Sequence, residues 1–592
     1  MGAFFLYQEN EKNADNGKSV SSIDRAAVNA CFEKKGFTAC IKRRLGAYTL
    51  LLYRKMMIED ENFIEVVEHA DKALYAVGTL VYKGLNYRES LRQLLDDFTG
   101  GRFDFDRLIG SFFVLIRVNE RLYGFTDRAG IQNIYYCLDS GVLSSSFLAV
   151  VAASPVRLHL NKLAVTEVLT TGNLVGPDTL IHEIKRVEPH TPPRFHGLRW
   201  IGAPESGPVV FDNGNHEETL GQQIELLNDY FKSIKPFADH YGLISGITGG
   251  LDSRLLLIVI KQTLSNYRFF STWRKIKTRE FSIAESVCKT AGVDFISIPY
   301  TEPLDMDEHQ ARDTLHRAFL FMDGHVRAHH FWHEAINTRD YRSALVGEQR
   351  LGMNGVGGEQ YRNEERMIRP RRNFKEWVAV ELVYKYSGDC FNDRVERNEF
   401  LFYLGNKIKT RLNLADPNRI GRLDVKRYFN EVYNPANRTV RTNMENQCHF
   451  CLSPYTDYTL ATNAYRIIPH LGVSREFEGE MIKRLDPVLA AIPTHYGEAL
   501  IRGEPLYSRL MSVVKELTPV SLYGKLYHAH KSKSTFYRDY VTKFPFIGEN
   551  TRMLEELRLP LNPDTIKGNA LLGPLVISMG HFLDELKTKI NG

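Results

Sequence analysis

The sequence has few of the features that mark secreted, membrane-spanning or nucleic-acid-binding proteins. Its 592 residues include seven cysteines, a sparse and odd number that does not suit a secreted disulfide framework. No apolar run approaches the ~18 residues of a membrane span, and the N-terminus turns polar by Gln8 without the segments of a signal peptide. Lysine plus arginine (76) exceeds aspartate plus glutamate (71) by only 5. We therefore expect a cytoplasmic protein with neither a membrane nor a nucleic-acid partner.

The length of the chain predicts more than one domain, because single hydrophobic cores stop growing near ~250–300 residues. Residues 201–218 are rich in glycine, proline and polar side chains and have no periodicity, which is typical of a linker. We therefore predict one domain over residues 1–200 and a second over residues 219–592.

The two predicted domains differ in their pattern of strands and helices. The first is dominated by short β-branched or alternating runs, with amphipathic helices at 90–98 and 160–169, which predicts an α+β fold. The runs are residues 47–53, 75–81, 110–118, 121–125, 134–137 and 142–145. In the second, helices alternate with strands at 241–247, 267–272 and 295–299, and the chain is mostly helical from about residue 374. This alternation predicts an α/β domain with a parallel sheet and a helical C-terminal part.

A glycine-containing loop joins the strand at 241–247 to the helix that follows. Glycines let backbone N–H groups approach an anion, and the helix N-terminus adds partial positive charge. Hydroxyls can donate to phosphate oxygens and an aspartate can bind Mg²⁺. The alternative interpretation is a plain strand-to-helix turn. The predicted ATP-binding residues of this loop are Thr248, Gly249, Gly250, Leu251, Asp252 and Ser253.

This segment, TGGLDSR, resembles the SGGxDS loop of the ATP pyrophosphatases, which cleave ATP between its α- and β-phosphates. Within that superfamily the chain resembles the asparagine synthetases over residues 1–200 and about 220–495. LYGFTDRAGIQNIYY at 122–136 is similar to part of their glutaminase domain, and Ser144 to Ser146 follow where that domain has serines. The resemblance implies an N-terminal-nucleophile-like sandwich ahead of an ATP-pyrophosphatase domain.

A second glycine-rich segment, NGVGGEQ at 354–360, resembles the family's Gly-x-Gly-x-Asp-Glu loop. Gly355, Gly357 and Gly358 admit pyrophosphate, and Glu359 is a second predicted metal ligand beside Asp252. Gln360 stands where the family has another carboxylate.

Further site residues follow from the resemblance alone. Ser453 to Asp457 and residues 482–493 resemble segments near the family's substrate pocket, and the family needs a catalytic lysine there. Lys483 is the candidate, with Arg475 and Arg484 as alternatives. The family binds the base near the end of the strand at 267–272, which suggests Thr272 and, beyond it, Trp273, although a tryptophan of the core is an equal alternative.

The resemblance breaks at position 2. Glutamine-dependent members carry there a cysteine whose free amine activates its own thiol, whereas this chain has Gly2. We therefore expect no glutaminase activity.

The resemblance implies an AMP-forming carbon–nitrogen ligase that uses ATP and Mg²⁺ to adenylate a small-molecule or peptide carboxylate, with amide formation to follow. The amine could be ammonia, free or from a partner protein, or an amine on the substrate, as in relatives that close β-lactam or lasso-peptide rings. Two alternatives are a tRNA-modifying thiolase with Cys448 and Cys451 as sulfur carriers, and a degenerate nucleotide-binding scaffold. The sequence identifies neither the substrates nor the oligomeric state.

Two other patterns have competing interpretations. His325, His329 and His333 recur every four residues, as metal ligands on a helix do, but no HExxH accompanies them and solvated helix histidines show the same spacing. Cys448 and Cys451 form one CxxC, which suits a redox pair, half of a zinc site or two buried core cysteines.

Overall fold

The computed structural model of this chain describes most of its length. The described residues are all of 1–592 except 9–22, 39, 59–65, 70–71, 203–208, 213, 274–276, 300–302, 327–348, 364–370, 473, 498–499, 501–506, 508–509, 511–512, 515–516, 532–533 and 592. No helix among them is long and apolar enough to cross a membrane.

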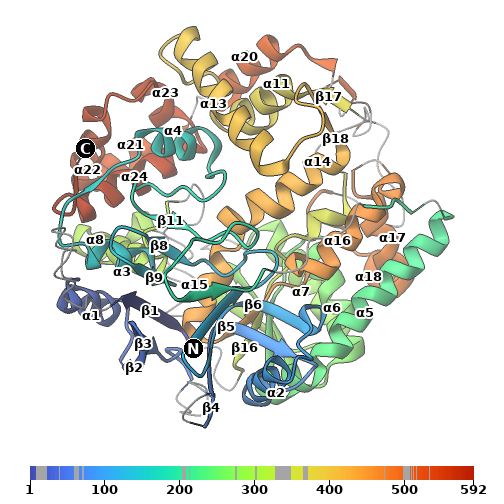
Figure 1. Cartoon of the computed structure of the whole chain (residues 1–592). Helices are drawn as coiled ribbons and strands as arrows, with labels where there is room; N and C mark the ends of the chain where they lie inside the picture. The colour runs from blue at the N-terminus through green and yellow to red at the C-terminus, as the bar shows by residue number, and fades with distance from the viewer. Residues whose placement is uncertain are drawn as a thin grey trace.

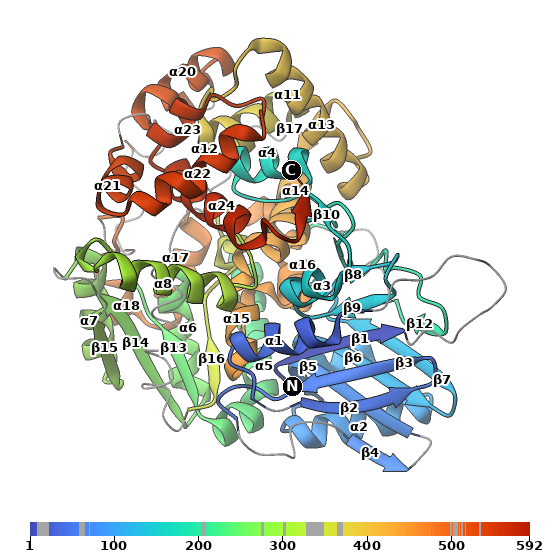
Figure 2. The ribbon, with the colours of Figure 1, turned by 90° about the vertical axis from the view of Figure 1, so that its left-hand side faces the viewer.

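The N-terminal part forms two largely antiparallel sheets that face each other (Figures 1 and 2). One has the order β11-β8-β9-β1-β3-β2 and the other β12-β7-β6-β5-β4. Phe4, Leu50 and Phe113 fill the layer between them. The strands are β1 (Ala3–Gln8), β2 (Cys40–Leu45), β3 (Tyr48–Tyr53), β4 (Val66–His69), β5 (Lys72–Tyr82), β6 (Leu108–Val118), β7 (Arg121–Thr126), β8 (Tyr135–Cys137), β9 (Val142–Ser144), β11 (Lys185–Arg186) and β12 (Leu198–Trp200).

Helices cover both outer faces of this sandwich. Their apolar residues recur at helical spacing, as in α2, whose Leu91, Leu94 and Leu95 are buried. The predicted helices at 90–98 and 160–169 are confirmed as α2 and α4. The helices of this part are α1 (Arg25–Lys34), α2 (Tyr87–Thr99), α3 (Phe147–Ala153) and α4 (Lys162–Thr171).

The second region contains a five-stranded, fully parallel sheet with the order β15-β14-β13-β16-β19. The predicted strands are confirmed as β13, β14 and β15, whereas β16 and β19 have three residues each and gave no pattern in the sequence. The elements are α5 (His216–Tyr241), β13 (Leu243–Gly246), α6 (Asp252–Thr263), β14 (Tyr267–Trp273), α7 (Arg279–Ala291), β15 (Phe295–Pro299), α8 (Glu308–Phe321), β16 (Leu351–Met353) and β19 (Phe450–Leu452). Because the strands are parallel, the loops after β13, β14, β16 and β19 emerge at one edge.

The rest of the chain is mainly helical, as predicted, and its last helices towards the C-terminus lie above both sheet regions in Figure 2. The helices are α11 (Phe374–Trp377), α12 (Lys385–Ser387), α13 (Arg394–Leu412), α14 (Arg422–Arg427), α15 (Val440–Cys448), α16 (Tyr458–Arg466), α17 (Glu476–Leu485), α18 (Pro487–Ala490), α20 (Val520–Lys531), α21 (Phe536–Lys543), α22 (Pro545–Glu556), α23 (Pro563–Gly568) and α24 (Leu572–Leu586). Two small two-stranded pairings join β10 (Leu158–His159) to β20 (Ile590–Asn591) and β17 (Arg371–Asn373) to β18 (Arg419–Gly421).

The hydrophobic core crosses the predicted domain boundary. One cluster joins Leu91 of α2 to Phe231 of α5 and Leu256 of α6. Another joins Phe147 of α3 to Phe582 of α24. The fold is therefore mixed α/β with a parallel sheet and many helices, and the division at residues 201–218 stays a prediction.

Candidate functional site

The loop at residues 248–253 connects β13 to α6 and is shaped by its own hydroxyl groups. The Thr248 N–H donates to Ser253 Oγ at 3.0 Å, and the two hydroxyl oxygens lie 3.1 Å apart. The Gly250 N–H donates to Thr248 Oγ1 at 3.1 Å. The hydroxyls predicted to contact phosphate therefore also fix the turn that presents the backbone.

The N-terminus of α6 has no side-chain cap among the described residues. Leu251 occupies the position before the helix. The first N–H groups of a helix have no partners within the helix and carry partial positive charge, so this end suits a phosphate group. This geometry agrees with the nucleotide-loop interpretation of the sequence.

The second glycine-rich segment follows β16, the neighbour of β13, and packs directly on Asp252. A Cβ at Gly355 would lie 3.2 Å from Asp252 Cβ, and one at Gly358 would overlap the Asp252 carboxylate. Gly357 has a φ of 93°, and a Cβ there would lie 2.9 Å from Thr456 Cγ2. Glycine is thus required where the two loops touch.

Asp252 belongs to a cluster of charges that the sequence motifs did not predict. Arg362 Nη2 donates to Asp252 Oδ1 at 2.5 Å, and Arg362 Nε donates to Glu478 of α17. The Arg362 and Glu478 side chains are 3% and 0% exposed, and that of Asp252 is 24% exposed. Burial and the nearby Glu478 charge raise the pKa of Asp252, which Arg362 opposes. One guanidinium therefore holds two carboxylates beside the nucleotide loop.

Glu359 has a separate counterion. Arg438 forms an ion pair with its carboxylate, and the buried Lys426 donates to its carbonyl oxygen at 2.9 Å. Asp252 and Glu359 stand on touching loops, and the Glu359 charge raises the pKa of Asp252. Two carboxylates at one edge of the sheet are oxygen donors of the kind that Mg²⁺ prefers, so the residues present fit a magnesium ion.

The segment after α18 closes over the loop. Arg254 is 0% exposed and donates to the carbonyls of Leu489 and Ile492 at 3.0 and 2.7 Å. The His495 N–H donates to Gly249 O at 3.0 Å, and His495 Nδ1 has no hydrogen-bond partner among the described residues. The predicted substrate-pocket segment 482–493 thus leads to the nucleotide loop.

The predicted segment at Ser453 to Asp457 also reaches the site. It follows β19, and the Tyr455 hydroxyl donates to Asp252 O at 3.1 Å. Tyr455 is fully buried. This hydrogen bond therefore ties the segment to the first turn of α6.

The candidate lysine is not brought to the loop. Lys483 is exposed and lies five residues beyond Glu478 on α17, roughly 140° around the helix axis. Arg484 pairs with Glu217 at 3.3 Å. Arg475 is different, because its guanidinium lies 3.3 Å from the Tyr496 ring, which packs on His495. Of the three candidates, Arg475 is thus the one connected to the loop, through Tyr496 and His495. The role of Lys483 stays a prediction.

Thr272 lies at the level of the nucleotide loop. Gly246 of β13 pairs with Phe270 of β14, so Thr272 and Trp273 end their strand at the edge where Thr248 begins the loop. Both are half-buried. This position is compatible with contact to a bound base.

The structure places the first of the three regularly spaced histidines outside a helix. His325 lies in a loop after α8, which ends at Phe321, because the chain turns at Asp323 and Gly324 with φ of 56° and 73°. His329 and His333 lie outside the described residues.

Position 2 lies inside the sandwich, just before β1. A Cβ at Gly2 would lie 2.8 Å from Arg54 O and 2.9 Å from Gln447 O. A cavity of about 20 Å³ borders Gly2, Gln132, Ser145 and Gln447. Two backbone carbonyls therefore fill the space that a nucleophilic side chain would need.

We expect Gly2→Cys to lower stability without creating glutaminase activity. The clash with two carbonyls should cost about 1–3 kcal/mol, as overpacking does. Thermal melts should show a lower Tm than wild type, and a coupled assay should detect no glutamate from glutamine with either protein. Glutamate release by homogeneous wild-type protein would contradict this prediction.

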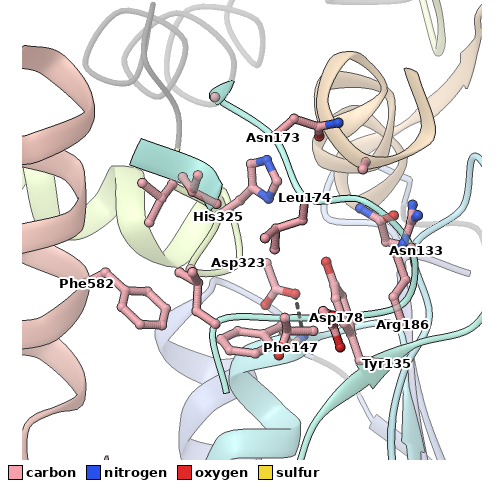
Figure 3. A pocket seen from close by; sticks show the side chains of 18 residues that line it. Asn133, Tyr135, Phe147, Asn173, Leu174, Asp178, Arg186, Asp323, His325 and Phe582 are labelled. Atoms are coloured by element: carbon pink, nitrogen blue, oxygen red, sulfur yellow. Dashed lines mark hydrogen bonds between the residues drawn. The ribbon is translucent and has the colours of Figure 1, made fainter. Parts of the chain in front are cut away.

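A larger cavity, of about 70 Å³, lies between the sandwich and the C-terminal helices. Figure 3 shows Tyr135, Phe147 and Phe582 around it, with Asp323 and His325 from the loop after α8. Arg186 also lines it, and its Nη1 has no hydrogen-bond partner among the described residues. None of the lining residues belongs to the nucleotide loops.

Sequence reasoning missed Arg362, Glu478, Arg438 and His495. Arg362 follows the second glycine-rich loop by two residues, so its proximity was a usable signal. His495 likewise follows the predicted segment 482–493 by two residues, whereas Glu478 and Arg438 gave no such signal.

Comparisons with known proteins do not assign the chain to a family. No protein-family model and no curated protein matches it. Among solved structures, it is similar to an NMN synthetase from Francisella tularensis, with 11% identity over 25% of this chain and 58% of that chain and a TM-score of 0.16. It is also similar to the U34-tRNA thiolase NcsA from Methanococcus maripaludis with its 4Fe–4S cluster, with 11% identity over 54% of this chain and 97% of that chain and a TM-score of 0.19.

Proposed function

We propose that this chain is an AMP-forming ligase of the asparagine synthetase type. A carboxylate attacks the α-phosphorus of ATP and pyrophosphate leaves, which gives an acyl-adenylate. An amine then attacks the acyl carbon, AMP leaves, and the amine loses a proton as the amide forms. The observation that supports this most is the contact between two glycine-rich loops on the adjacent parallel strands β13 and β16, beside the uncapped N-terminus of α6.

The charged groups of the site suit this chemistry. Asp252 and Glu359 are the residues that would hold Mg²⁺, and the ion would supply positive charge to neutralise the phosphates. Arg362 and Arg438, which pair with those carboxylates, offer guanidinium donors beside the same loops. Preorganised donors of this kind stabilise charge that develops at a phosphate during the reaction.

The thiolase alternative is disfavoured by the position of its cysteines. Cys448 and Cys451 are 2% and 0% exposed. The Cys451 N–H donates to Thr79 of β5 at 2.8 Å, and its thiol donates to the buried Glu445 at 3.1 Å. A sulfur carrier has to reach its substrate, whereas Cys451 is enclosed between β19 and β5, and Cys448 lies in an apolar cluster with residues of α8 and the C-terminal helices. A pair of buried core cysteines describes them better.

The test is a screen for pyrophosphate and AMP release with amino acids, uronic acids and peptides as carboxylates. With the carboxylate labelled with ¹⁸O, the proposal predicts one labelled oxygen in the AMP, because the carboxylate oxygen stays on phosphorus. A scaffold protein would bind ATP and release neither product. ADP and phosphate as products would contradict the proposal.

The amine donor is tested in the same reaction. If ammonia is the donor, ammonium salts should raise amide formation, and the rate should rise with pH as the NH₃ fraction rises. If the substrate carries its own amine, ammonium should make no difference.

A further inference from the structure

Two histidines and a glutamate meet between α8 and α24, in a region without a role in the proposed function. His316 comes from α8, and His581 and Glu585 come from one face of α24, four residues apart. One ligand atom from each lies within 4.8 Å of the other two. His316 Nδ1 and Glu585 Oε1 are 2.7 Å apart, and His581 Nε2 is 3.4 Å from the same oxygen.

His581 has an unusual environment for a buried polar residue. It is 5% exposed, and neither of its ring nitrogens has a hydrogen-bond partner among the described residues. Buried polar atoms without partners are costly and rare in folded proteins. Burial also lowers the pKa of this imidazole to about 4, so the ring is in the neutral form that binds metals. His581 thus offers a ring nitrogen that has no hydrogen-bond partner among the described residues and lies near the Glu585 carboxylate.

The charges around the cluster are compatible with a cation. Glu585 contributes a carboxylate, and the acidic Asp313 and Asp584 lie close enough to affect the histidines. Lys34 at the end of α1 is the opposing charge. The side chain of His316 is 40% exposed, which gives an ion a path from solvent.

We propose that His316, His581 and Glu585 bind a Zn²⁺ ion that joins α8 to α24. Two imidazoles and a carboxylate are a donor set that zinc uses, with water in the fourth position. Binding through His316 Nδ1 requires its hydrogen bond to Glu585 to open. A protonated His316 ring would then release one proton, whereas a neutral ring would keep its proton on Nε2. The ion would fix the relative position of α8 and α24. Both helices contribute to the cavity in Figure 3, through Asp323 just after α8 and Phe582 on α24.

The test uses the full-length protein freed of metal and titrated with Zn²⁺ against a chromophoric chelator. Wild type should bind one equivalent at this site, and Zn²⁺ should raise its Tm. His316→Gln and Glu585→Gln should each weaken binding about 100-fold or more and abolish the Tm increase. Co²⁺ in place of zinc should give the visible absorption of a four-coordinate site in wild type and in neither His316→Gln nor Glu585→Gln.

The matched control is His309→Gln, an exposed histidine on the same helix α8. It should bind zinc and gain Tm as wild type does. His316 is at the surface, so His316→Gln should fold even if a change at the buried His581 does not. Wild-type affinity in both His316→Gln and Glu585→Gln would overturn the proposal, as would an equal loss in His309→Gln or the absence of stoichiometric binding in wild type.

Discussion

Asp252→Ala should reduce pyrophosphate release by about 100- to 1,000-fold or more, the loss that follows removal of one group that stabilises charge in a transition state. Asp252 stands at the first position of α6, against Gly355 and Gly358 of the second loop, where it can contact Mg²⁺. The measurement is the initial rate of pyrophosphate release with saturating ATP and the carboxylate found in the screen.

The fold should survive this substitution, because Arg362 keeps Glu478 as a partner and little core volume is lost. Far-UV circular dichroism and the Tm provide the control. Glu359→Ala should have the same direction and a smaller effect, since Gln360 already replaces one carboxylate of the family's loop. Turnover of Asp252→Ala at the wild-type rate would exclude the adenylation mechanism.

Arg362→Leu should destabilise the protein by about 3–5 kcal/mol, the cost of removing one partner from a buried ion pair. Arg362 lies between Asp252 and Glu478, and its own side chain is 3% exposed. Without the guanidinium, two carboxylates would share a buried site. The free energy of unfolding in urea measures the effect.

The loss should grow with pH. The pKa of Asp252 is already raised by burial and by Glu478, and removal of Arg362 raises it further. A carboxyl group whose folded pKa lies above its unfolded value contributes stability below the unfolded pKa and loses it as pH rises through the folded pKa. Arg362→Leu should therefore differ least from wild type in acid and most at neutral to alkaline pH.

The double variant Arg362→Leu with Glu478→Gln isolates the charge effect. It should recover part of the lost stability, because one buried carboxylate is replaced by a neutral amide. A loss below about 1 kcal/mol in Arg362→Leu, the range of exposed ion pairs, would show that these charges are solvated and that the buried cluster is not the stabilising unit.

Local patterns predicted the longest strands, β5 and β6, and the alternation of helix and strand around the parallel sheet. The strand at 295–299 has the predicted bounds, and the helix predicted after the strand at 241–247 is α6, because apolar periodicity and the flanking turns are properties of short segments. β16 and β19 were missed, since three apolar residues carry no period. β1 was also missed, although it lies at the centre of the first sheet between β9 and β3, because its buried run of six residues does not alternate.

The sequence by itself determined the two glycine-rich loops and the absence of a side chain at position 2. Each of these depends on residues that are adjacent in the chain. Only the tertiary structure decided which charges meet there: Arg362 with Asp252 and Glu478, Arg438 with Glu359, and His316 with the pair on α24. Partners separated by about 80 to 270 residues are selected by the packing of whole helices and strands, because a buried charge is tolerated only where the fold supplies its counterion.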